Sequence, residues 1–341
     1  MVDFTGGEEA MKFLDKVPRS QSHISSITSN SKSTSGSNGP TQAIRKHPLF
    51  YYFFITYSIS YALLIPSVLS AWNILKGDFT LTFTLYNFAP AMAAIIMVTA
   101  VEGKAGLVQM GNRLRQWRAG LWWYLFILVG VPTLLMLGII IQPGVFASFQ
   151  GLKPALLVSY VLYFVVVLFV GGPLGEEIGW RGFALPRMQP RYGPLLGTVL
   201  LSIPWVFWHF PQFWMPTMGG GPGTGLTPFL VNLPLFFIMV MATAIIVTWV
   251  FNHTRGSIFT CVLLHTSIDV PQDVLIPLFL AVSYTTMFLG GVIAFGVTAL
   301  LIVILTRGRL GYQPIQNKQE IPKEAPDHVS LSLELKTKTK G

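Results

Sequence analysis

Apolar runs close to or above the length that crosses a lipid bilayer recur along this sequence, and they constrain its fold more than any other feature. A helix rises 1.5 Å per residue, so about 20 apolar residues span the roughly 30 Å hydrocarbon core. The predicted spans are 49–72, 81–101, 121–141, 154–172, 193–212, 229–251, 257–270 and 278–305. Because backbone groups in lipid must be hydrogen-bonded within the protein, we predict an all-α, polytopic membrane helix bundle of about eight transmembrane helices.

Charged residues are scarce between the two ends of the chain. Only 11% of the 341 residues are Asp, Glu, Lys or Arg, against about 25% in soluble domains, and 52% are hydrophobic. More than half of the charged residues lie in 1–47 and 306–341. This distribution excludes an ordinary soluble enzyme and a nucleic-acid-binding protein. We predict a disordered polar cytoplasmic tail at 1–47, a transmembrane domain at 48–305 and a charged cytoplasmic tail at 306–341.

The positions of Lys and Arg predict the orientation in the membrane. If the chain starts in the cytoplasm and crosses eight times, 21 of the 23 Lys and Arg residues fall in cytoplasmic segments. Only Lys76 and Lys153 fall on the other side. Cytoplasmic loops carry this excess of basic residues, so both termini are expected in the cytoplasm. The membrane would be the plasma membrane in a prokaryote and the endoplasmic reticulum in a eukaryote. The net charge of +9 is then explained by the basic cytoplasmic segments and their attraction to anionic lipid, and not by a nucleic-acid partner.

A small set of ionisable residues lies within or beside the apolar spans, where such groups are costly and usually functional. They are Glu176, Glu177, Arg181, His209, His265 and Asp269. If the nearest basic or glycine positions mark the inner membrane surface, the helical rise puts the Glu176, His209, His265 and Asp269 side chains about 15 to 24 Å deep. Polar groups at that depth are tolerated where they line a cavity, so we predict a polar chamber inside the bundle.

Helical spacing predicts how the first of these residues are arranged. Residues 154–187 would form a helix of about 50 Å, too long for one crossing, and Gly171-Gly172-Pro173 is the expected break. Glu177 and Arg181 are four residues apart, so they share a face and can pair. Glu176 points elsewhere and is left as a candidate general base.

The third membrane-associated segment carries His265 and Asp269 one helical turn apart. They share a face, so the Asp269 carboxylate can orient the His265 imidazole. Cys261 lies one turn earlier and is interpreted as a small apolar packing residue. As the sole cysteine, it excludes both an internal disulfide and a cysteine-based zinc site.

These residue types support more than one chemistry. A glutamate can take a proton from a water held with one histidine, while the second histidine or its neighbour stabilises the oxyanion of a tetrahedral intermediate. Alternatively Glu176, His209 and His265 bind Zn²⁺ with water in the open position, although the His-Glu-x-x-His pattern is absent. A proton-coupled transporter would also use buried acids and histidines. No other cofactor is indicated.

Three short motifs resemble those of the CPBP family, which comprises the type II CAAX prenyl endopeptidases and bacteriocin-processing (Abi) proteins. The string Glu176-Glu-Ile-Gly-Trp-Arg181, followed by Gly-Phe-Ala-Leu-Pro-Arg, is similar to the family's Glu-Glu-x-x-x-Arg motif. His209 is similar to the histidine of Phe-x-x-x-His, and His265 to that of His-x-x-x-Asn. The resemblance makes 48–305 a transmembrane protease domain with its motif core at 171–270.

The resemblance implies an intramembrane endopeptidase, either of the glutamate type or metal-dependent. Its substrate would be a membrane protein or a lipidated peptide, such as a prenylated CAAX-type protein. Glu176 would activate water, His209 would help to hold that water, and His265 with residue 269 would form the oxyanion site. Glu177 and Arg181 would be supporting residues.

Two residues depart from the family pattern. Trp205 stands where Phe is usual, and this exchange of one aromatic ring for another is expected to be harmless. Asp269 stands where Asn is common. An ionised carboxylate cannot donate a hydrogen bond, so we expect Asp269 to orient His265 and His265 to stabilise the oxyanion.

Two other functions compete with the protease. The first is a proton-coupled membrane transporter, although transporters often repeat a broken helix in both halves, and here the break at Gly171–Pro173 has no obvious twin. The second is a catalytically inactive relative that acts as an immunity or scaffold protein. The joint presence of Glu176, His209 and His265 argues against it.

Overall fold

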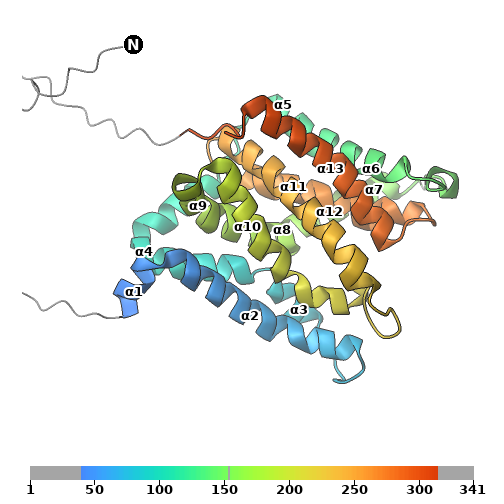
Figure 1. The fold of residues 1–341 in the computed structure, drawn as a ribbon, viewed down its shortest axis with the longest axis horizontal. Helices are drawn as coiled ribbons and strands as arrows, with labels where there is room; N and C mark the ends of the chain where they lie inside the picture. The colour runs from blue at the N-terminus through green and yellow to red at the C-terminus, as the bar shows by residue number, and fades with distance from the viewer. Residues whose placement is uncertain (1–39, 153, 314–341) are drawn as a thin grey trace, which may run out of the picture. The chain divides into compact units, whose positions relative to one another are not determined.

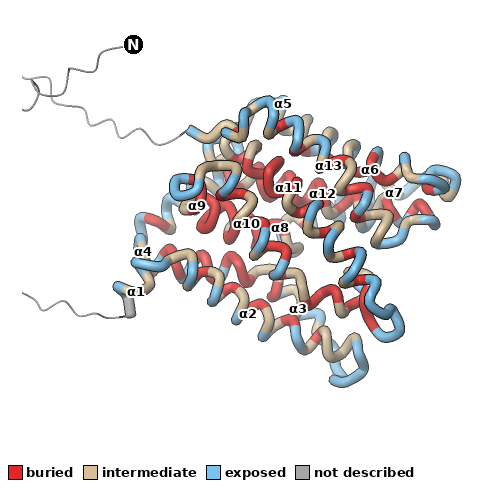
Figure 2. The backbone as a smooth tube through the Cα atoms, in the orientation of Figure 1, coloured by how far each residue is buried: buried red, intermediate tan, exposed pale blue. Residues whose placement is uncertain are grey.

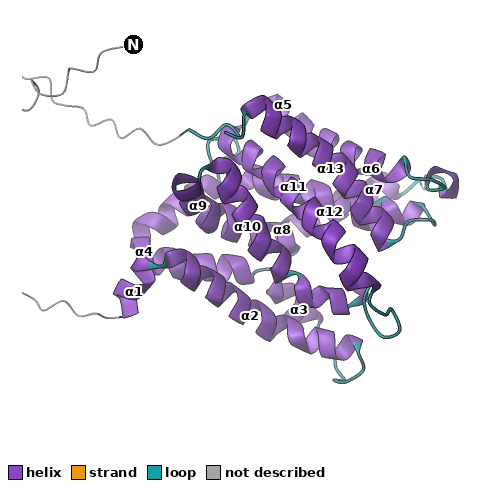
Figure 3. Ribbon diagram, in the orientation of Figure 1, coloured by secondary structure: helices purple, strands orange, loops and turns teal. Residues whose placement is uncertain are grey.

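The computed structural model describes residues 40–152 and 154–313, and the regular elements in these ranges are helices (Figures 1 and 3). The all-α prediction is therefore confirmed for the described part of the chain. The α-helices are α1 (Pro40–Lys46), α2 (Pro48–Ala71), α3 (Thr80–Tyr86), α4 (Ala89–Leu114), α5 (Leu121–Leu125), α6 (Val131–Ile140), α7 (Leu156–Val170), α8 (Gly172–Gly179), α9 (Leu185–Tyr192), α10 (Pro194–Trp208), α11 (Leu233–His253), α12 (Ile258–Val274) and α13 (Tyr284–Thr306).

Seven helical segments in the described ranges are long and apolar enough to cross a membrane, which makes the chain an integral multi-pass membrane protein. They are Pro48–Ala71, Ala89–Leu114, Leu121–Ile140, Leu156–Tyr192, Pro194–Trp214, Pro228–His253 and Tyr284–Thr306. The remaining predicted span, 257–270, is α12. This helix has 17 residues, about 25 Å, and 12 of them are buried. It is thus a short helix packed inside the bundle, against α6, α7, α8 and α11.

Two predicted spans differ from the helices that the structure shows. The span predicted at 81–101 is divided, because α3 ends at Tyr86 and α4 starts anew at Ala89, with Pro90 near its start where a missing N–H costs little. The span predicted at 278–305 starts at Tyr284. There the Ser283 hydroxyl caps the helix by accepting from the Thr286 N–H at 3.2 Å.

Most of the two predicted tails, 1–39 and 314–341, lies outside the described residues. The parts next to the bundle are folded, contrary to the predicted boundaries. Residues 40–46 form α1, which packs against α4. Beyond α13, Leu310 is fully buried and its carbonyl accepts from Asn252 Nδ2 at 3.0 Å. Apolar side chains in these two short segments pack against the bundle. The polar composition of the tails as a whole gave no indication of this packing.

The predicted break between α7 and α8 is present. Helix α7 ends at Val170, and Gly171 is extended with φ −77° and ψ −177° before α8 resumes at Gly172. Pro173 lies in the first turn of α8, where it costs no internal hydrogen bond. Helix α8 packs against α4, α7 and α12, so the break brings the Glu-Glu sequence into the middle of the bundle.

Small residues let the helices approach closely, as is common between membrane helices. A Cβ atom at Gly138 of α6 would lie 2.3 Å from the Gly290 carbonyl oxygen of α13, and one at Gly175 of α8 would lie 2.2 Å from the Asn87 carbonyl oxygen. Figure 2 shows buried residues gathered along α11 and at α8. The core thus surrounds the helices that carry the predicted site.

We expect Gly138→Ala to destabilise the protein by about 1–3 kcal/mol, because the added methyl group must push α6 away from the α13 backbone. Thermal unfolding in detergent measures this effect. The matched control is Gly296→Ala in α13, where a Cβ atom would meet nothing within 4 Å. Equal melting temperatures for both variants would contradict this account of the α6–α13 contact.

Candidate active site

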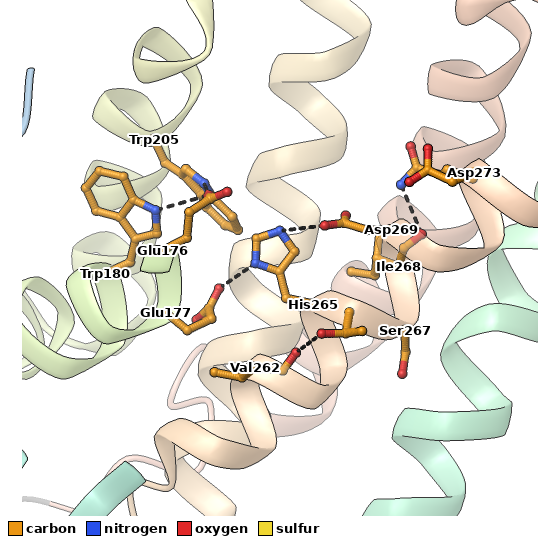
Figure 4. Close-up of polar contacts among 12 residues, drawn as sticks. Glu176, Glu177, Trp180, Trp205, Val262, His265, Ser267, Ile268, Asp269 and Asp273 are labelled. Atoms are coloured by element: carbon orange, nitrogen blue, oxygen red, sulfur yellow. Dashed lines mark hydrogen bonds and ion pairs between the residues drawn. The ribbon is translucent and has the colours of Figure 1, made fainter. Parts of the chain in front are cut away.

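One cavity of about 880 Å³ brings the predicted catalytic residues together. Glu176 of α8, His209 at the end of α10, and His265 and Asp269 of α12 all line it. The three helices lie in different parts of the motif core, so the fold assembles residues that are far apart along the chain. Figure 4 shows Glu176, His265 and Asp269 directed into the same region.

Glu177 and Arg181 form a completely buried ion pair beside this cavity. Arg181 Nη1 donates to Glu177 Oε1 at 2.8 Å, and neither side chain is exposed. The pairing predicted from their four-residue spacing is therefore present. A buried charge pair fixes two side chains strongly, because separating them would leave a charge without a partner in an apolar environment.

Glu177 also contacts His265, which the sequence did not predict. His265 Nδ1 lies 3.0 Å from the same Oε1 atom of Glu177, whereas Asp269 Oδ2 lies 3.8 Å from His265 Nε2 (Figure 4). Only the first distance is that of a hydrogen bond. Glu177 thus orients the His265 ring more directly than Asp269 does, and this corrects the expectation that Asp269 performs that task. The correction has a simple reason, since helical spacing reveals neighbours on one helix only.

Glu176 has two indole partners. Its Oε2 atom accepts from Trp205 Nε1 at 2.6 Å and faces Trp180 Nε1 at 3.4 Å. The other carboxylate oxygen, Oε1, lies against Gly172 on the cavity wall, where a Cβ atom would come within 2.6 Å. Helical spacing predicted that Glu176 does not pair with Arg181, and in the structure Arg181 bonds to Glu177 instead. Trp180 is four residues after Glu176, so helical spacing could have indicated it, whereas Trp205 comes from another helix and spacing could not.

His209 is anchored by the backbone of its own helix. Its Nδ1 lies 2.9 Å from the Trp205 carbonyl oxygen, and only a protonated Nδ1 can bond to a carbonyl. In the neutral ring this leaves Nε2 as an acceptor. Cys261 is buried and donates from Sγ to the Ser257 carbonyl at 3.2 Å, as expected of a packing residue.

The proposed zinc ligands do not form a metal site in this arrangement. Within 40–152 and 154–313, no three His, Cys, Asp or Glu side chains converge closely enough to share one ion. Glu176 is held by Trp205, and His265 by Glu177. The donor set Glu176, His209 and His265 therefore does not fit a zinc ion here, and no step below is derived through a metal.

A helical membrane bundle that encloses a carboxylate and two imidazoles defines a class of intramembrane site, and comparisons with known proteins show which proteins the chain is similar to. Residues 157–271 match the family model described as type II CAAX prenyl endopeptidase Rce1-like. The chain is also 24% identical over 261 residues to CAAX prenyl protease 2 of Methanococcus maripaludis. This match covers 74% of this chain and 92% of that protein.

The matched segment is therefore similar to the Rce1-like family, and the resemblance to CPBP proteins is confirmed. It contains the predicted site residues from Glu176 to Asp269. The family and the relative support a protease that works in a membrane.

Removing the buried cation tests the importance of the ion pair for folding. We expect Arg181→Met to destabilise the protein by about 3–5 kcal/mol, because the Glu177 carboxylate loses its fixed cation in the core. Unfolding in detergent checks this value against Arg118→Met, an exposed arginine expected to change stability by less than about 0.5 kcal/mol. If the double variant Glu177→Gln/Arg181→Met were less stable than Arg181→Met alone, charge loss would not be the cause.

Proposed function

We propose that this protein is an intramembrane endopeptidase in which Glu176 activates water to hydrolyse a peptide bond of a membrane-associated substrate. The observation that carries the proposal is the meeting of Glu176, His209 and His265 in one cavity, within the segment that matches a protease family. A general base, a water-holding group and an oxyanion donor are the parts that uncatalysed amide hydrolysis lacks.

In the first step, one water lies between Glu176 and His209. Glu176 Oε1 accepts one proton of this water, and His209 Nε2 accepts a hydrogen bond from the other. The water oxygen then attacks the carbonyl carbon of the scissile bond, and the proton moves to Glu176. The indole bonds to Oε2 support this assignment, because they occupy Oε2 and leave Oε1 to accept the proton.

In the second step, the tetrahedral intermediate carries a negative oxygen that His265 stabilises. With Nδ1–H directed at Glu177, a protonated Nε2 donates to the oxyanion, and the Asp269 carboxylate at 3.8 Å balances the positive ring. The carbon–nitrogen bond then breaks, and Glu176 returns its proton to the leaving amine. Asp269 acts through His265, because an ionised carboxylate has no hydrogen to donate.

The candidate substrate is a CAAX-type protein with a lipid anchor. The relative's name supports this class, and the cavity supports it chemically. Apolar side chains from α11 and α13, among them Phe236, Met239 and Phe288, line the cavity beside the polar residues. A substrate with an apolar chain near its scissile bond would bury that chain against them.

Glu176→Gln is the decisive variant for this function. It keeps the shape of the side chain but cannot take a proton from water, so we expect kcat for a prenylated peptide in detergent to fall by at least about 100-fold. The control is Asp78→Asn in an exposed loop, which should cleave like the wild type. Full activity of Glu176→Gln would exclude the mechanism.

The same assay separates the competing functions. If the wild type cleaves neither a prenylated nor a membrane-embedded peptide but drives proton-linked uptake in liposomes, the chain is a transporter. If it does neither, it is an inactive immunity or scaffold relative. If a chelator abolished cleavage by the wild type, the reaction would depend on a metal ion, as the zinc alternative requires.

The orientation proposed from the basic residues, with both termini in the cytoplasm, has a consequence for substrate entry. Helix α12 starts beside Arg255 and ends beside Asp273, and α13 starts at Tyr284 and ends beside Arg307. The exposed residues of the cavity wall, which include Asp273, Ser283 and Tyr284, are therefore at the end of the bundle opposite the basic loops. With cytoplasmic termini, the cavity opens toward the non-cytoplasmic side.

Cysteine labelling tests this orientation, since the natural chain has one cysteine and it is buried. In a Cys261→Ala background, we expect a membrane-impermeant maleimide to label Ser283→Cys in intact cells. Asn112→Cys, at an exposed position in the last turn of α4, should react only after permeabilisation. The reverse result would overturn the orientation and would favour a substrate presented from the cytoplasm.

A further inference from the structure

Trp205 contacts four of the ionisable residues of the site. Its Nε1 donates to Glu176 Oε2 at 2.6 Å, and its carbonyl oxygen lies 2.9 Å from His209 Nδ1. Its ring lies 4.4 Å below the Arg181 guanidinium carbon and meets the His265 ring edge-to-face at 5.5 Å. The side chain is only 2% exposed. The indole therefore contacts Glu176, Arg181 and His265, and Figure 4 shows it near Glu176 and His265.

The stacking with Arg181 fixes the plane of the ring. Arg181 makes one hydrogen bond, to Glu177, while its buried Nε and Nη2 atoms have no hydrogen-bond partner among the described residues. A guanidinium over an indole face is stabilised by the negative charge of the π system, so the ring compensates in part for these missing bonds. The Glu177–Arg181 pair thus holds Trp205, and Trp205 in turn holds Glu176.

The indole N–H then determines which oxygen of Glu176 can react. A hydrogen bond to a carboxylate is charge-assisted and short, and this one is 2.6 Å long. The second indole, Trp180, faces the same oxygen at the longer distance of 3.4 Å. Both donors act on Oε2, and Oε1 is left toward the cavity wall at Gly172.

We propose that Trp205 is a positioning residue that binds Oε2 of Glu176 through its indole N–H and so presents Oε1 to the attacking water. The proposal rests on the function proposed above. A phenylalanine, the usual residue of the motif that Trp205 departs from, could fill the same space but could not donate this bond. The tryptophan is thus a functional feature of this chain and not a neutral exchange of aromatic rings.

Trp205→Phe tests the role of the N–H while keeping an aromatic ring between Arg181 and His265. We expect kcat for a prenylated peptide to fall by about tenfold or more, with KM changed by less than about twofold, because one charge-assisted bond to the base is lost. Trp208→Phe is the matched control. It lies on the same helix and loses a buried indole bond, to Ser60 Oγ at 2.6 Å, and its kcat should stay within about threefold of the wild type. An unchanged kcat for Trp205→Phe, or equal losses in both variants, would overturn the proposal.

A second measurement does not depend on activity. In protein labelled with ¹⁵N-tryptophan, the indole N–H signal that Trp205→Phe removes belongs to Trp205. A short bond to a carboxylate moves this proton downfield, so the signal should move upfield in Glu176→Gln, while the signal removed by Trp208→Phe stays in place. If the chemical shift of the Trp205 indole proton is the same in Glu176→Gln as in the wild type, the hydrogen bond between Trp205 and Glu176 is refuted. An inactive wild type with the expected shift would refute the proposed function and leave the contact standing.

Discussion

The charge on Glu177 is the constraint on which the rest of the site depends. A carboxylate that is completely buried in a membrane bundle needs a partner, and Arg181 supplies it one helical turn later. Because Glu177 also accepts from His265, the same carboxylate ties α8 to α12. Two of the three helices that line the polar part of the cavity are therefore fixed to each other by one oxygen atom, Glu177 Oε1.

The backbone makes this contact reachable. A continuous helix through 154–187 would run past the centre of the bundle, and the extended Gly171 redirects the chain so that α8 starts there. Helix α12 is short and mostly buried, so its polar residues face other helices and not lipid. Helix α10 completes the site with Trp205 and His209 near its end. Among the described residues, the ionisable groups of the site thus lie where a helix break, a short helix and close glycine contacts enclose them.

The sequence predicts much of this, and its failures have a physical cause. Long apolar runs predict the helical bundle, the Gly-Gly-Pro step predicts the break, and four-residue spacing predicts the Glu177–Arg181 pair. Spacing cannot predict contacts between helices, so the bond from Glu177 to His265 and the bond from Trp205 to Glu176 became visible only in the fold. Helix limits were wrong where local capping decides them, as at Pro90 and Ser283. The family motifs correctly indicated the residues of the cavity. They suggested that Trp205 only replaces a Phe, and so gave no indication of its bond to Glu176.

The central claim is that Glu176 and His209 hold the attacking water between Oε1 and Nε2. A high-resolution cryo-electron microscopy map of the protein in lipid nanodiscs tests this most directly. The account predicts one ordered water within about 3 Å of both atoms, with Trp205 Nε1 bonded to Oε2 of Glu176. A map in which Glu176 points away from the cavity, or in which Glu176, His209 and His265 converge on a single metal ion, would contradict it.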